Sequence, residues 1–237
     1  MDENTWVLDG QNGRHNPFSE KAVRNGFVRK VYTLLTLQLL ITVGVCALFI
    51  FVPEVQQYAL THPSLLWAAI ISYLVLAIAL SCCQSFQRKW PWNLLALFAL
   101  TLALSYLVAV IANNYAPQSV LAALVITVVC CVAVSVFAIN TSYDFTSCYG
   151  TLFLLSLFLL LWGLLFMPFF QMEVMQKVYA GLGAGLFMLY LAADTQMIMG
   201  RKQLAISAED YVVATLMIYL DLINIFLFIL ALMGQSK

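Results

Sequence analysis

Seven long apolar stretches constrain the fold of this chain more than any other feature. A helix needs about 20 apolar residues to cross a hydrocarbon core of about 30 Å. The seven stretches run from Val31 to Val52, Leu65 to Cys83, Leu94 to Ala112, Val120 to Ile139, Thr151 to Phe170, Val178 to Met199 and Val212 to Met233. We therefore predict an all-α polytopic membrane protein with seven transmembrane helices.

These stretches leave little of the chain outside the bilayer. Of 237 residues, 63% are hydrophobic. The sequence divides into a polar segment, residues 1–30, a membrane domain, residues 31–233, and a short tail, residues 234–237. This organisation predicts membrane lipid as the surrounding partner and excludes a separate soluble catalytic module.

The basic residues predict the orientation of the bundle. Nine of the eleven lie on one predicted side and only Lys177 and Lys237 on the other; the nine are Arg14, Lys21, Arg24, Arg29, Lys30, Arg88, Lys89, Arg201 and Lys202. Cytoplasmic loops carry an excess of Lys and Arg, so we expect a cytosolic N-terminus and a C-terminus on the far side. The formal net charge is zero, which gives no reason to expect a nucleic-acid partner.

Two predictions about surface chemistry depend on this orientation. Cys82 and Cys83 precede Arg88 and Lys89, so they are candidates for palmitoylation, with small buried apolar residues as the alternative. Asn140 begins an Asn-Thr-Ser sequon on a predicted cytosolic loop, where we expect no glycan.

Small residues in the sixth span and capping residues before the seventh span predict local features of helix packing. Gly181 and Gly185 form a small-xxx-small pair, which predicts a close approach by another helix. Ser207 followed by Asp210 predicts a capping box at the start of the last helix. Glu209 and Asp210 also form an acidic cluster, which could instead attract cations near a pore mouth.

Two aspartates interrupt the apolar stretches and are the strongest functional signal. Asp194 and Asp221 lie inside the sixth and seventh spans. A carboxylate at the centre of a membrane helix costs about 2.5–3.5 kcal/mol and usually faces a cavity or a partner. At 1.5 Å per residue, Asp194 lies about 10 Å and Asp221 about 13 Å from the predicted cytosolic side. The two carboxyl groups can therefore meet, or each can make a separate structural hydrogen bond.

Helical spacing supplies possible supporting residues for this pair. Tyr190 shares a helix face with Asp194, and Asn224 shares one with Asp221. Two carboxylates about 4 Å apart repel by about 4 kcal/mol at an effective dielectric of 20, so we expect the pair to hold one shared proton near neutrality. Calcium prefers oxygen ligands, so Asp194 and Asp221 could also bind it transiently. We expect calcium as a permeant ion and no resident cofactor.

An intramembrane aspartyl protease also uses two aspartates on neighbouring helices. Its Gly-x-Gly-Asp signature is missing, because Ala193 precedes Asp194 and Leu220 precedes Asp221. The histidines, His15 and His62, lie outside the spans and far apart in sequence, which disfavours a serine or metal mechanism. We therefore predict that the chain is not an enzyme.

Several short motifs together carry a family resemblance. They are residues 24–32 (RNGFVRKVY), 90–94 (WPWNL), 144–148 (DFTSC), 193–196 (ADTQ), 207–211 (SAEDY) and 219–226 (YLDLINIF). In these motifs the chain resembles the transmembrane Bax-inhibitor-motif family, and most closely its lifeguard branch.

The resemblance implies a bundle of seven helices with the last helix at its centre. It implies a calcium leak across internal membranes, pH control by the aspartate pair and suppression of cell death. The implied location is the endoplasmic reticulum or Golgi, with the plasma membrane and the lysosome as alternatives. A non-conducting membrane adaptor that restrains death signalling by binding other apoptosis-regulating membrane proteins is the alternative function.

Overall fold

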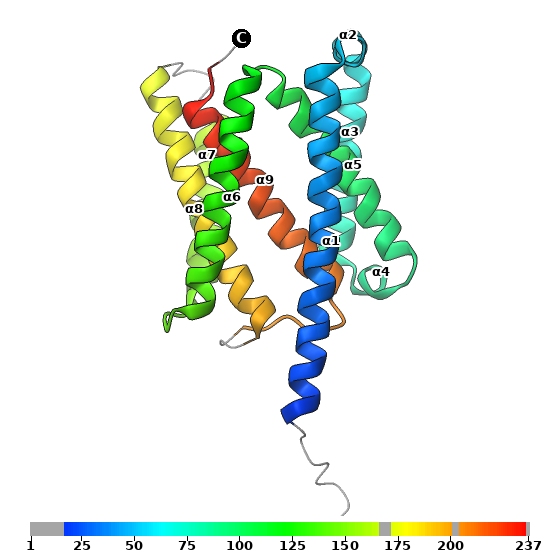
Figure 1. The fold of residues 1–237 in the computed structure, drawn as a ribbon, viewed down its shortest axis with the longest axis vertical. Coiled ribbons are helices and arrows are strands. Elements are labelled where there is room, and N and C mark those ends of the chain that lie inside the picture. Colours follow the sequence, from blue (N-terminus) through cyan, green and yellow to red (C-terminus); the bar gives the residue numbers. More distant parts are fainter. Residues whose placement is uncertain (1–16, 166–171, 201–203, 236–237) are drawn as a thin grey trace, which may run out of the picture.

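The computed structural model describes residues 17–165, 172–200 and 204–235 as a helical bundle without strands in those ranges (Figure 1). The elements are α1 Pro17–Phe51, α2 Pro53–Thr61, α3 Pro63–Cys82, α4 Gln84–Arg88, α5 Trp92–Ala112, α6 Pro117–Asn140, η1 Phe145–Cys148, α7 Tyr149–Leu165, α8 Glu173–Met199 and α9 Tyr211–Met233. Seven of the described helices are long and apolar enough to cross a membrane. The predicted fold class is confirmed.

Proline positions several of the helix starts. It occupies the first turn of α2, α3 and α6, where its missing N–H leaves no helical hydrogen bond unmade. The predicted spans agree with the observed helices to within a few residues at most of the described ends, and the predicted end of the fifth span, Phe170, lies outside the described residues. The largest difference is α1, which begins at Pro17 rather than Val31 and so extends into the predicted polar segment. Hydropathy identifies only the length that crosses lipid, whereas a helix can continue into water.

The last helix lies at the centre of the bundle. In Figure 1, α9 runs diagonally behind α1 and α6, and it packs against α1, α3, α5, α6 and α8. Its most extensive interface is with α8. Helix α7 packs against α8 and η1, and in Figure 1 it lies behind α6 and α8. The implied arrangement around a central last helix is therefore present, although α7 contacts the bundle mainly through α8.

Burial differs sharply among the spans and points to where a polar site can be held. In the most apolar window of α3, 6% of residues are buried inside the protein, whereas the figure for α8 is 61%. The outer helices expose large apolar side chains such as Trp67, Ile78, Leu154 and Leu164, as expected for surfaces in contact with lipid. Polar groups on α8 and α9 must therefore find partners within the protein.

The close approach between α8 and α9 uses a different glycine from those predicted. A Cβ atom added to Gly183 would lie 2.5 Å from ring carbons of Phe228, whereas one added to Gly181 or Gly185 would have no atom within 4 Å. The prediction for the Gly181–Gly185 pair was therefore wrong. Gly183 lies between them in sequence, about 160° away from Gly185 around the helix axis, on the face that meets α9.

The start of α9 also differs from its prediction. Asp210 occupies the N-cap position but its side chain makes no cap hydrogen bond, and Ser207 precedes the cap by three residues. The capping-box prediction was wrong, because the carboxylate of Asp210 faces Arg88 instead. Arg88 donates to both Asp210 carboxylate oxygens, at 2.8 and 3.0 Å.

Candidate functional site

Asp194 and Asp221 meet at the interface between α8 and α9. Asp194 is 2% exposed and Asp221 is 5% exposed. The two carboxyl groups lie within hydrogen-bonding range of each other. A carboxylate can only accept hydrogen bonds, so a bond between two carboxyl groups requires a proton on one of them. Sequence spacing allowed Asp194 and Asp221 to meet without requiring it, and the structure places them together.

Each carboxyl group also retains an unused oxygen. Asp194 Oδ1 and Asp221 Oδ2 are buried and have no hydrogen-bond partner among the described residues. A buried carboxylate oxygen without a partner costs free energy, and such groups cluster where a protein has a functional reason to keep them. The pair is therefore only partly satisfied by its own surroundings.

A third residue, Tyr149, reaches the pair from α7. Its hydroxyl lies within hydrogen-bonding range of Asp194. Tyr149 was not among the predicted site residues, because it precedes the predicted fifth span and nothing in its local pattern marks it. The predicted supporting residue Tyr190 lies beside it: the two rings pack edge to face with centroids 5.5 Å apart. The Tyr190 hydroxyl donates to Ser156 Oγ at 3.4 Å.

Gln196 fixes the connection that places Tyr149. Its Oε1 accepts from the backbone N–H of Phe145 at 2.9 Å, and its Nε2 donates to the carbonyls of Ala138 and Tyr143 at 3.1 and 2.9 Å. One buried amide on α8 thus holds the end of α6 and the start of η1. Since Gln196 is two residues from Asp194, the same turn of α8 positions both the acid and the chain segment that carries Tyr149.

The other predicted supporting residues either lie far from the aspartate pair or make hydrogen bonds within their own helix. Asn224 Nδ2 donates to the carbonyl of Leu220 at 2.8 Å, within α9. Glu209 and Asp210 lie at the start of α9, about 15 Å or more along the helix from Asp221.

These two acids pair with an arginine, and the Glu209 side chain remains largely exposed to solvent. Arg88 contacts Glu209 at 2.8 Å in addition to Asp210. Hydrogen bonding and the charge of Asp210 raise the pKa of the Arg88 guanidinium, so the ion pair joins α4 to α9 at any physiological pH.

The arrangement supports proton exchange and transient cation contact better than a tight metal site. Among the described residues there is no group of three or more His, Cys, Asp or Glu side chains that could hold a metal ion. Two carboxylates can supply oxygen ligands, but calcium usually takes six to eight. A change of one proton alters the interaction between α8 and α9 directly, because the pair lies at their interface.

Comparisons with known proteins agree with this architecture. The family described as "Inhibitor of apoptosis-promoting Bax1" matches residues 24–237. The chain is 37% identical to Protein lifeguard 3 of Mus musculus over 225 residues, 94% of this chain and 73% of that protein. It is 37% identical to Protein lifeguard 3 of Homo sapiens over 223 residues, 93% of this chain and 72% of that protein.

A second lifeguard protein is similar over nearly the same length. Protein lifeguard 4 of Mus musculus is 35% identical over 208 residues, which are 88% of this chain and 84% of that protein. The matches include both aspartate-bearing helices, because the family match extends through residue 237. The chain belongs to the transmembrane Bax-inhibitor-motif family, in its lifeguard branch.

Proposed function

We propose that this protein is a proton-gated calcium leak in an internal membrane. The observation that carries the proposal is the buried pair of carboxyl groups within hydrogen-bonding range at the α8–α9 interface. Ionisable groups inside membrane spans are rare, face the protein interior or a cavity, and mark ion pathways and proton relays. Calcium leak, proton gating and the role of the pair are all part of this proposal.

The gate works through one shared proton. With the proton present, the hydrogen bond between Asp194 and Asp221 joins α8 to α9. When cytosolic pH rises and the proton leaves, two negative charges about 4 Å apart repel by about 4 kcal/mol at an effective dielectric of 20. Separation of the helices, or a cation between the carboxylates, relieves that repulsion. The leak should therefore increase with pH.

Calcium suits this site as cargo rather than as a bound cofactor. The unpartnered oxygens, Asp194 Oδ1 and Asp221 Oδ2, are hard ligands of the kind that calcium prefers. With only two carboxylates the affinity is low, and an ion that must leave again needs a weak site. The carboxylates therefore act as a point of transit.

The biological role follows from the relatives. The matching family is described as an inhibitor of an apoptosis-promoting protein, and we extend that role to this chain. A steady leak lowers the calcium content of the endoplasmic reticulum or Golgi, which limits how much calcium a death signal can release. With nine basic residues on one side, we place the N-terminus and the α4–α9 ion pair in the cytosol.

Flux measurement on the purified protein tests the proposal. Full-length protein in calcium-loaded liposomes should release calcium faster than protein-free liposomes, and the release should increase as external pH is raised from acidic to neutral. Glu173→Gln is a matched control, because Glu173 is exposed and pairs only with Lys177 on its own helix among the described residues. It should retain the wild-type pH profile. Folded protein that releases no calcium at any pH would instead support the adaptor function.

A further inference from the structure

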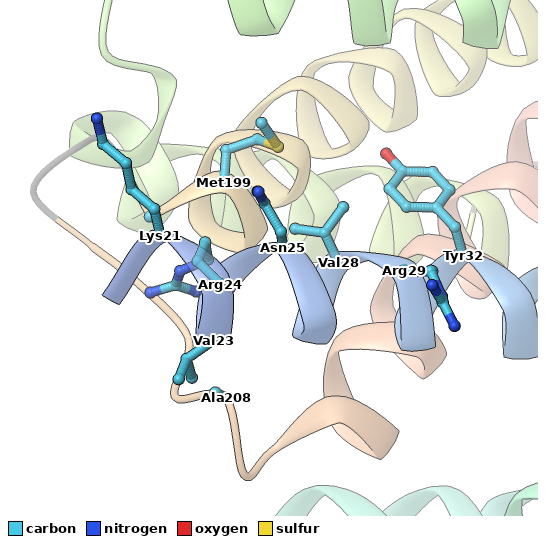
Figure 2. A pocket seen from close by; sticks show the side chains of 10 residues that line it. Lys21, Val23, Arg24, Asn25, Val28, Arg29, Tyr32, Met199 and Ala208 are labelled. Atoms are coloured by element: carbon cyan, nitrogen blue, oxygen red, sulfur yellow. The ribbon is translucent and has the colours of Figure 1, made fainter. Parts of the chain in front are cut away.

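A second site lies at the basic end of the bundle, away from the aspartate pair. A groove of about 1090 Å³ runs between the first turns of α1 and the end of α8, and Ala208 from the α8–α9 connection also lines it. Figure 2 shows Lys21, Asn25 and Tyr32 extending from the same side of α1, with Met199 of α8 beside Lys21 and Asn25 and with Tyr32 further along the helix. Neither Asp194 nor Asp221 is among the described lining residues.

The groove is positively charged. Lys21, Arg24 and Arg29 line it, and no carboxylate is among its lining residues in the described part of the chain. Lys21 and Arg29 are exposed, so their charges are available to a ligand. The bundle thus presents three cations to one groove, which favours an anionic occupant.

One of these cations is fixed in place by the fold. Arg24 Nη1 donates to the carbonyls of Ile198 and Ile206, at 3.1 and 2.9 Å. Gly200 makes room for the guanidinium: its φ is 64°, and a Cβ added there would lie 2.5 Å from Arg24 Nη2. Carbonyls do not neutralise a guanidinium, and the ion pairs between described residues do not include Arg24, so within the described part of the chain Arg24 is a preorganised positive charge at the edge of the groove.

The position of the groove relative to the membrane indicates which kind of anion it binds. Helix α1 continues from Lys21 directly into the first membrane span, which ends at Phe51. The groove therefore lies where lipid headgroups lie, and Val28 and Met199 add apolar surface next to the cations. Basic pockets between transmembrane helices on the cytoplasmic side bind anionic headgroups, and the cytoplasmic leaflet is rich in them.

We propose that this groove binds the phosphate-bearing headgroup of an anionic bilayer lipid. Lys21 and Arg29 contact the headgroup, and Arg24 contributes fixed charge while holding α1 to the end of α8. The proposal does not depend on calcium leak, because it concerns a different set of residues and a binding event that can be measured on the resting protein.

A binding titration with matched variants tests it. Short-chain phosphatidylinositol 4-phosphate is titrated into full-length protein in neutral detergent, with short-chain phosphatidylcholine as the reference. The phosphoinositide should bind more tightly. The double variant Lys21→Gln/Arg29→Gln should bind it about 25-fold more weakly, since each surface cation contributes about fivefold. The charge-conserving variant Lys21→Arg/Arg29→Lys should keep the wild-type affinity.

Two controls test whether the lipid binds in the groove itself. Lys89→Gln removes an exposed cation at the same end of the bundle but outside the groove, and it should leave the affinity unchanged. Equal weakening by Lys89→Gln, or wild-type binding by the double glutamine variant, would overturn the proposal. Displacement of the lipid by an equal concentration of inorganic phosphate would also overturn it, because the site would then bind a soluble anion.

Discussion

Helix α9 carries two polar regions on opposite faces, and they differ in chemistry. Tyr219 faces α1 and α5 and is fully buried. Its hydroxyl lies 2.8 Å from Thr42 Oγ1, which lies 2.9 Å from Ser105 Oγ. Two residues further along, about 200° around the helix, Asp221 faces Asp194 on α8. One region is a neutral hydroxyl network and the other is an acidic pair.

The difference shows which interface can change and which is suited to remain fixed. The hydroxyls of the neutral network satisfy one another, and none of them changes charge near neutral pH. Interhelical hydrogen bonds of this kind contribute about 0.6 kcal/mol on average in a membrane. In the acidic pair, loss of one proton replaces attraction by a repulsion of about 4 kcal/mol. We infer that α9 stays attached to α1 and α5 while its contact with α8 responds to pH.

The largest loss of stability is expected for a substitution at the point where α8 and α9 pack most closely. Gly183→Leu should lower the stability of the protein by about 1–3 kcal/mol, because the side chain must displace the Phe228 ring. That ring is itself held by Phe187, with stacked centroids 5.8 Å apart. Gly185→Leu is the matched control, since a Cβ there meets no atom within 4 Å. Thermal unfolding in detergent measures the stability of both variants. Equal losses of stability would show that Gly183 is not the point of closest approach between α8 and α9.

Tyr149→Phe should sharpen the comparison by changing only the acidic region. The variant removes the hydroxyl near Asp194, which stabilises a deprotonated carboxylate. A hydrogen bond to a charged group contributes about 1.5 kcal/mol, so the midpoint of the flux profile should move up by about one pH unit. Calcium efflux against pH measures it. Tyr179→Phe, also on the α7–α8 side, is the control and should leave the midpoint in place.

Thr42→Val should change only the neutral region. It removes the hydroxyl that links Ser105 and Tyr219, at a cost of about 1 kcal/mol in stability. The pH dependence of calcium efflux should stay as in the wild type, because no titrating group is altered. Thr33→Val is the control: Thr33 is exposed and its hydroxyl donates within its own helix, to Arg29 O. A shifted pH profile in Thr42→Val alone would break the proposed division between the two faces.

Features of this protein that depend on a single physical quantity could be predicted from its sequence. The seven spans follow from apolar length alone. The similar depths of Asp194 and Asp221 allowed the two residues to meet but also allowed separate hydrogen bonds, and the structure places the two carboxyl groups within hydrogen-bonding range. The regulatory role of the pair remains a proposal.

Features that depend on the rotation of a helix about its own axis could not be predicted from the sequence, because this rotation decides which residues face a neighbouring helix. Gly181, Gly183 and Gly185 are indistinguishable by composition, yet only Gly183 faces Phe228. Tyr149 approaches Asp194 because Gln196 anchors the preceding connection, a contact between residues 51 positions apart. Ser207 and Asp210 have the local pattern of a capping box, but Arg88, distant in sequence, offers the Asp210 carboxylate a charged partner. Such long-range partners leave no local signal.

The pH dependence of calcium efflux in aspartate variants tests the central claim most directly. Wild type, Asp194→Asn, Asp221→Asn and the double variant are compared in proteoliposomes after thermal unfolding shows that each is folded. Asparagine keeps the size of the side chain and removes its charge, so the pH dependence should flatten in both single variants. The double variant should add little, because the two residues act as one unit. If both single variants keep the wild-type pH profile, the pair is not the proton sensor.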